Sequence, residues 1–102
     1  MINIYFKTIR DKKFKQIDQF RVGCWINVED ATVEDLEKIA DLSELEYFDL
    51  QDSLDIFEIP RVERQDDKTL IFVRNPSEKS ELYTEILTII LSKKFLITIS
   101  PS

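Results

Sequence analysis

Residues 45–63 read LEYFDLQDSLDIFEIPRVE and combine a helical pattern with the start of a strand. Apolar residues recur at spacings of three and four, which predicts an amphipathic helix over about residues 45–55. The apolar residues of this helix are Tyr47, Leu50 and Leu54. Pro60 disfavours helical geometry at the residue before it, so we expect the helix to end upstream and a strand to begin at Arg61. This change from helix to strand is typical of an α/β domain.

Alternating apolar and polar residues outside this stretch predict that most of the chain forms a β-sheet. The expected strands are residues 2–7, 14–17, 24–28, 61–64, 69–74, 82–91 and 95–100. The polar residues at 75–80 predict a loop between two of them. The predicted fold is α/β, with a mixed, largely antiparallel β-sheet and helices packed on it, as part of an α/β/α sandwich.

A further amphipathic helix is predicted for residues 33–42. Thr32 is a favourable N-cap, because its hydroxyl can accept a hydrogen bond from an amide of the first turn. Acidic residues in that turn also suit the positive end of the helix dipole. The expected apolar stripe consists of Val33, Leu36, Ile39 and Ala40. A helix with one such stripe should pack against the sheet.

The composition indicates one acidic domain. A chain of 102 residues, 43% hydrophobic and 11% aromatic, can bury a single core. Its net charge of −6 argues against nucleic acid and anionic membranes as partners. The sequence has no histidine and no glycine-rich phosphate loop, so we expect no enzymatic activity. Cys24, the lone cysteine, alternates with Ile26 and Val28, which predicts a buried apolar residue.

The downstream strands are apolar on both alternating faces, and such strands require cover on both sides. Two helices on one face would leave the other face bare. We therefore expect a chain that is truncated before a further helix, or an oligomer that covers the bare face. The sequence has no secretion signal and no apolar run close to the ~18 residues of a membrane span, so we expect no direct membrane insertion.

Aspartates recur every three residues along the helix predicted for residues 45–55, at Asp49, Asp52 and Asp55. On a helix this spacing forms one row, and Asp52 should face outward if the leucines face the core. Such a row is either a solvated surface or half of a divalent-cation site. Mg²⁺ is commonly held by one or two carboxylates and several waters, so a second chain or a later segment would complete the shell.

Several short motifs resemble, in their order, the cytoplasmic N-terminal domain of the CorA family of divalent-cation transporters. These motifs are Trp25-Ile26-Asn27-Val28, residues 32–42, Asp49-Leu50-Gln51-Asp52-Ser53-Leu54, Pro60-Arg61-Val62-Glu63, residues 69–74, residues 87–91 and residues 93–98. The resemblance extends from Gly23 to Ser100. It implies that Asp52 contributes to a regulatory metal site between neighbouring subunits, whereas Gln51 replaces the glutamate that precedes this aspartate in the family.

The resemblance further implies a regulatory domain, residues 1–102, of a transport protein for Mg²⁺ or Co²⁺. The domain would lie at the cytoplasmic face of the cell membrane, join a stalk helix and membrane helices, and assemble as a homopentamer. Mg²⁺ would bind weakly at Asp52, with smaller contributions from Asp49 and Asp55. A CorA-related zinc transporter is one alternative, although a sequence without histidine disfavours a zinc site here. A stand-alone acidic module that binds a basic protein is another.

Overall fold

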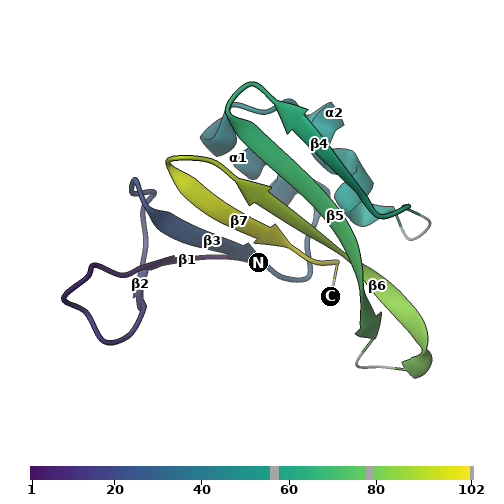
Figure 1. Ribbon diagram of the computed structural model, residues 1–102, viewed down its shortest axis with the longest axis horizontal. Helices are drawn as coiled ribbons and strands as arrows, with labels where there is room; N and C mark the ends of the chain where they lie inside the picture. Colours follow the sequence, from purple (N-terminus) through teal and green to yellow (C-terminus); the bar gives the residue numbers. More distant parts are fainter. Residues whose placement is uncertain (56–57, 78–79, 102) are drawn as a thin grey trace.

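The strands pair into one twisted sheet (Figure 1). The computed structural model describes residues 1–55, 58–77 and 80–101. The strands are β1 (Ile2–Phe6), β2 (Lys15–Ile17), β3 (Cys24–Val28), β4 (Arg61–Gln65), β5 (Lys68–Ser77), β6 (Ser80–Leu91) and β7 (Phe95–Ile99). Their order across the sheet is β2-β1-β3-β7-β6-β5-β4. Strands that are distant in sequence therefore meet at the centre of the sheet.

Neighbouring strands in this sheet are antiparallel, apart from one pair. β3 and β7 run parallel, with Cys24 opposite Phe95 and Ile26 opposite Ile97. The prediction of a mixed, largely antiparallel sheet is confirmed. The alternation in β3 also has the predicted effect, since Cys24 is 2% exposed and both Ile26 and Val28 are 0% exposed.

The first helix, α1 (Val33–Ser43), begins at the predicted N-cap. The Thr32 hydroxyl accepts a hydrogen bond from the backbone N–H of Asp35 at 3.1 Å. The Asp35 carboxylate in turn accepts one from the backbone N–H of Thr32 at 3.2 Å, which completes a capping box. A hydrogen bond from the α-ammonium group of Met1 lowers the pKa of Asp35. These contacts fix the start of α1 beside the N-terminus of the chain.

The apolar stripe of α1 is buried except at its first residue. Leu36 and Ile39 are 0% exposed and Ala40 is 7% exposed, whereas Val33 is 50% exposed. The prediction for Val33 is therefore wrong. Helical side chains tilt toward the N-terminus, so the side chain of the first residue projects beyond the surface that the helix covers.

The next helical segment is shorter and tighter than predicted. α2 (Tyr47–Leu50) is a single α-helical turn, and η1 (Gln51–Leu54) is a 3₁₀-helix. The prediction of one α-helix over residues 45–55 is therefore wrong. Leu50 and Ser53 are both 0% exposed, because side chains three residues apart lie on the same side of a 3₁₀ turn.

The β5–β6 hairpin extends further than predicted. β5 continues to Ser77 and β6 starts at Ser80, so much of the loop predicted over residues 75–80 belongs to strands. Residues 78–79 of that predicted loop lie outside the described residues. The pairing register shifts directly after Pro76. Proline has no N–H to donate to a ladder, so a position beside a strand irregularity suits it.

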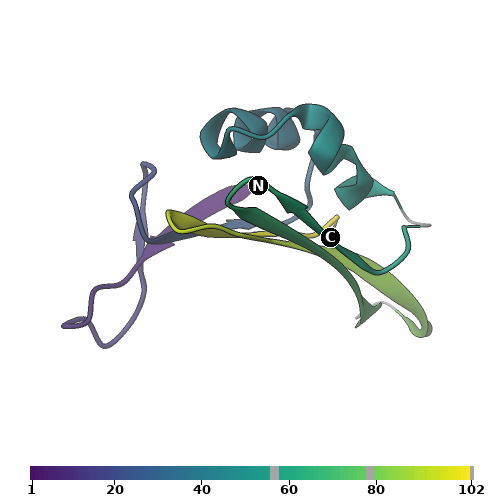
Figure 2. The same ribbon diagram turned by 45° about the horizontal axis from the view of Figure 1, so that its top comes forward.

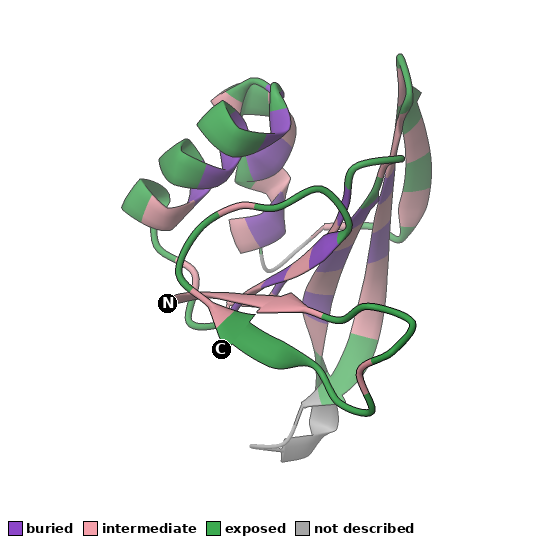
Figure 3. Ribbon diagram, turned by 90° about the vertical axis from the view of Figure 1, so that its left-hand side faces the viewer, coloured by how far each residue is buried: buried purple, intermediate pink, exposed green. Residues whose placement is uncertain are grey.

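The helices α1 and α2 and the 3₁₀-helix η1 lie on the same face of the sheet (Figure 2). Buried residues gather between the helices and the sheet (Figure 3). The largest fully buried side chains include Phe72, Ile26, Leu36, Ile39, Leu50, Leu70, Ile86, Ile90, Ile97 and Ile99. No helix among the described residues covers the opposite face, which agrees with the expectation of a bare face. None of the described helices has the length and apolar character to cross a membrane.

Candidate metal-binding site

Three acidic side chains meet where η1 ends and the chain turns toward β4. Asp52, Asp55 and Glu58 each offer one carboxylate oxygen, and these oxygens lie within 4.8 Å of one another. The N–H of Asp55 donates to the carbonyl of Asp52 at 3.1 Å, and the N–H of Glu58 donates to that of Asp55 at 3.2 Å. Two successive three-residue steps therefore bring the side chains together. We refer to these three residues as the acidic cluster.

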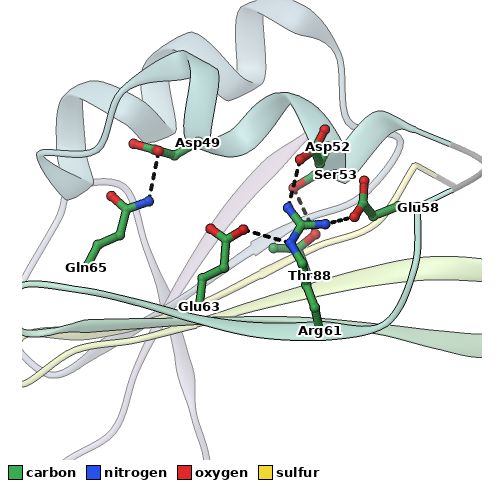
Figure 4. A network of polar contacts seen from close by, with 8 residues as sticks. All are labelled: Asp49, Asp52, Ser53, Glu58, Arg61, Glu63, Gln65 and Thr88. Atoms are coloured by element: carbon green, nitrogen blue, oxygen red, sulfur yellow. Dashed lines mark hydrogen bonds and ion pairs between the residues drawn. The ribbon is translucent and has the colours of Figure 1, made fainter.

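Arg61, the first residue of β4, binds two members of the acidic cluster (Figure 4). Its Nη2 donates to Asp52 Oδ2 at 2.7 Å, and its Nη1 forms an ion pair with Glu58. Its Nε donates to Glu63 Oε1 at 2.7 Å. Partial burial lowers the pKa of Arg61, but hydrogen bonds to Glu63 and Asp52 outweigh this effect and raise it above its ordinary value. The guanidinium therefore remains charged beside the carboxylates.

Asp52 lies at the margin of the core instead of facing straight outward as predicted. Its side chain is 37% exposed, and its carboxylate turns toward Arg61. The neighbouring Ser53 is 0% exposed, and its hydroxyl accepts a hydrogen bond from Thr88 Oγ1 at 2.8 Å. This buried contact fixes η1 on β6 and holds Asp52 in place. The exposed part of the Asp52 side chain remains within reach of a second molecule.

Asp49 lies apart from the acidic cluster. Its Oδ1 accepts a hydrogen bond from Gln65 Nε2 at 2.8 Å, and its Oδ2 accepts one from the backbone N–H of Glu46 at 3.1 Å. The second bond caps the start of α2. The predicted row of three aspartates is therefore divided, with Asp52 and Asp55 in the cluster and Asp49 bound elsewhere. Figure 4 shows Asp49 beside Gln65 and Asp52 beside Arg61.

The sequence carried a signal for one of the residues that the predicted site omitted. Glu58 continues the spacing of three that begins at Asp49, and it follows Asp55 by one further step. The contacts of Arg61 with Asp52 and Glu58 had no comparable signal. They join residues of different elements, and periodicity does not describe such contacts.

The acidic cluster suits a hard divalent cation. Its ligand atoms are carboxylate oxygens, which Mg²⁺ and Ca²⁺ prefer. The three carboxylates outnumber the guanidinium of Arg61, which pairs with two of them. The nitrogen and sulfur ligands that zinc prefers are not provided, because the chain has no histidine and Cys24 is buried. Water or a second chain would have to supply the remaining ligands of a bound cation.

A family model and two solved structures point to one family. The family described as CorA-like Mg2+ transporter protein matches residues 21–102. The complete CorA magnesium transporter from Methanocaldococcus jannaschii has a TM-score of 0.75 and 28% identity, and the match covers 97% of this chain and 32% of that one. The soluble domain of that protein has a TM-score of 0.72 at the same 28% identity, over 97% of this chain and 40% of that one. This chain therefore spans about a third of the length of the complete transporter.

A further solved structure shares the fold at lower identity. The ZntB cytoplasmic domain from Vibrio parahaemolyticus has a TM-score of 0.67 at 14% identity, and the match covers 97% of this chain and 43% of that one. At this identity the likeness concerns the fold alone. No curated protein sequence matches the chain.

Proposed function

Because this chain belongs to the family of CorA-like Mg²⁺ transporter proteins, we propose that it is the regulatory, cytoplasmic domain of a divalent-cation transporter. Proteins of this family are transporters, so the role proposed for the domain is regulation of transport rather than enzymatic catalysis. Its ligand would be intracellular Mg²⁺, with Co²⁺ as a second candidate. The single observation that supports a site most directly is the meeting of Asp52, Asp55 and Glu58 oxygens within 4.8 Å.

Asp52 is the residue that we propose as the principal metal ligand. Its side chain is 37% exposed, so a carboxylate from a neighbouring subunit could approach the same cation. Asp55 and Glu58 add negative charge on the same side. Asp49 contributes only to the local potential, since Gln65 and Glu46 already occupy its oxygens. The site would thus be completed between subunits of a homo-oligomer, which the resemblance implies to be a pentamer.

The proposed regulation follows from electrostatics. Without Mg²⁺, acidic clusters that face other carboxylates across a subunit boundary repel one another. A bound Mg²⁺ replaces this repulsion with bridging contacts and favours the assembly that closes the pore. Loss of Mg²⁺ reverses the bias, as expected for a ligand that binds one of two states more tightly.

The test is the Mg²⁺ dependence of transport in the whole transporter. The transporter with Asp52→Ala should require at least about tenfold more Mg²⁺ to close its pore, because losing a ligand that contributes about 1.4 kcal/mol weakens Mg²⁺ binding about tenfold. Asp41→Ala is a matched control, since it removes the same charge from an exposed position of α1. Equal closing concentrations for Asp52→Ala and the unaltered protein would refute the proposal.

Transport of Mg²⁺, Co²⁺ and Zn²⁺ by the same preparation separates the two family alternatives. Preference for Zn²⁺ would support the zinc alternative. The ligand chemistry of this domain favours Mg²⁺, because its clustered ligands are carboxylates.

A further inference from the structure

A cation already binds the acidic cluster, namely the guanidinium of Arg61. We propose that Arg61 is a built-in competitor of the divalent metal, and that it sets how much metal the domain needs before it responds. This inference rests on the proposed function, because it concerns the same carboxylates. Arg61 reaches both Asp52, which belongs to η1, and Glu58, which lies three residues before Arg61 in the chain.

The side chain of Arg61 packs against Phe72, a residue of β5 in the sheet. Its guanidinium lies 4.1 Å above the centre of the Phe72 ring, and Phe72 is 0% exposed. A cation over an aromatic face is attracted to it. Glu63, two residues along the same strand, holds Nε from the side. The charge is therefore held next to the carboxylates by its contacts with Phe72 and Glu63.

Arg61 and a metal make incompatible demands on the same groups. The guanidinium uses Oδ2 of Asp52 and Oε1 of Glu58. A divalent cation that takes these oxygens must displace Arg61, and a cation that takes only the outer oxygens must remain close to its positive charge. Both arrangements weaken metal binding relative to three carboxylates alone. The affinity of the site is thus lowered by a residue that binds no metal.

The competition also couples the metal to the fold. Asp52 belongs to η1, whereas Arg61 begins β4, so their ion pair joins the helical layer to the edge of the sheet. Metal that withdraws Asp52 from Arg61 would replace this internal link with a link to the metal. The state of the metal site would then be transmitted to β4 without a change elsewhere in the core.

The test compares variants of Arg61 in the whole transporter, with the Mg²⁺ concentration that half-closes transport as the readout. Arg61→Gln should lower this concentration about three- to tenfold, because one unit charge within several ångströms at the surface is worth about that factor. Arg64→Gln is the matched control, as it removes the same charge from an exposed position of the same strand. Arg61→Lys keeps the charge but not the planar fork that reaches both carboxylates, so its half-closing Mg²⁺ concentration should lie between those of Arg61→Gln and the unaltered protein.

The outcomes distinguish this inference from the proposed function. If the Asp52→Ala variant and the unaltered protein half-close at the same Mg²⁺ concentration, the proposed function fails and this inference fails with it. Only the inference is overturned if Asp52→Ala raises the half-closing Mg²⁺ concentration while Arg61→Gln leaves that concentration unchanged or raises it. A variant that merely damages the fold would not gain Mg²⁺ sensitivity. Should Arg61→Gln fail to assemble, Arg61→Met keeps the apolar stem over Phe72 and is judged by the same criterion.

Discussion

The two faces of the sheet are built from the same strands and differ sharply in burial. On the helix side, Leu70, Ile90 and Ile97 are all 0% exposed. On the other side, the alternate residues of these strands are only half-buried, and Leu91 at the end of β6 is 44% exposed. The residue types are similar on both faces, so the cover provided by α1, α2 and η1 makes the difference. The apolar residues of the open face therefore lie outside the buried core of the described residues.

The open face is ordered by side-chain contacts of its own. Trp25 Nε1 donates to Thr98 Oγ1 at 2.9 Å, and Thr98 Oγ1 donates to Asn27 Oδ1 at 2.8 Å. The Trp25 ring also packs against the rings of Tyr5 and Phe14, with centroids 5.1 and 5.8 Å apart. An apolar face with a built-in polar chain is typical of a surface that contacts further protein. The comparison of the two faces yields measurable contrasts.

The largest contrast is expected between neighbouring isoleucines of β6. Ile90→Ala should lower the free energy of unfolding by about 2–5 kcal/mol, because it leaves a cavity in the core. Ile89→Ala, on the open face, should lower it by less than about half as much, in proportion to the smaller area it buries. Urea unfolding of both variants provides the measurement. Equal losses would contradict the comparison, since they would mean that Ile89 is fully covered in solution.

A smaller contrast is expected between two threonines. Thr88→Val removes the hydroxyl that donates to Ser53 in the core and should reduce stability by about 1–3 kcal/mol. Thr98→Val should reduce it by under ~1 kcal/mol, because the groups it leaves on the part-buried face can bond to water. Thermal unfolding at fixed pH compares them. Combining Thr88→Val with Ser53→Ala should recover part of the loss, and a larger loss would argue against a simple hydrogen-bond effect.

The smallest expected effect concerns the helical layer alone. Thr32→Ala removes the N-cap of α1 and should lower stability by about 1 kcal/mol without altering the open face. Thr32→Ser retains the accepting hydroxyl and serves as the control. Hydrogen exchange of the first turn of α1 should quicken in the alanine variant only. If both variants behaved alike, the cap would not be what stabilises this turn.

The elements of the fold were predictable where one local cause fixes them. The capping hydroxyl of Thr32 determines where α1 begins, and alternation determines which residues of β3 are buried. The neighbours of each strand were not predictable, since alternation gives a face and not a partner. The parallel contact of β3 with β7 therefore had no signal in the sequence.

The candidate site was predictable only in part for the same reason. The spacing of Asp52 and Asp55 is visible in the sequence, but over so few residues it does not distinguish an α-helical from a 3₁₀ turn. Asp49 lies apart from the other two aspartates because its carboxylate binds Gln65, at the end of β4. Arg61 came to the cluster through the turn that precedes β4. Contacts between separate elements form only when the chain folds, so they leave no periodic pattern in the sequence.

The central position of β7 in the sheet has a consequence for folding during synthesis on the ribosome. A ribosome makes β1, β2 and β3 early and β4, β5 and β6 later, yet within the sheet these two groups are joined through β7 (Phe95–Ile99). While synthesis proceeds, each group exposes an unpaired edge strand to the crowded cell. β7 pairs with both of these edges, β3 on one side and β6 on the other. Chaperone protection of the nascent chain should therefore matter until β7 emerges.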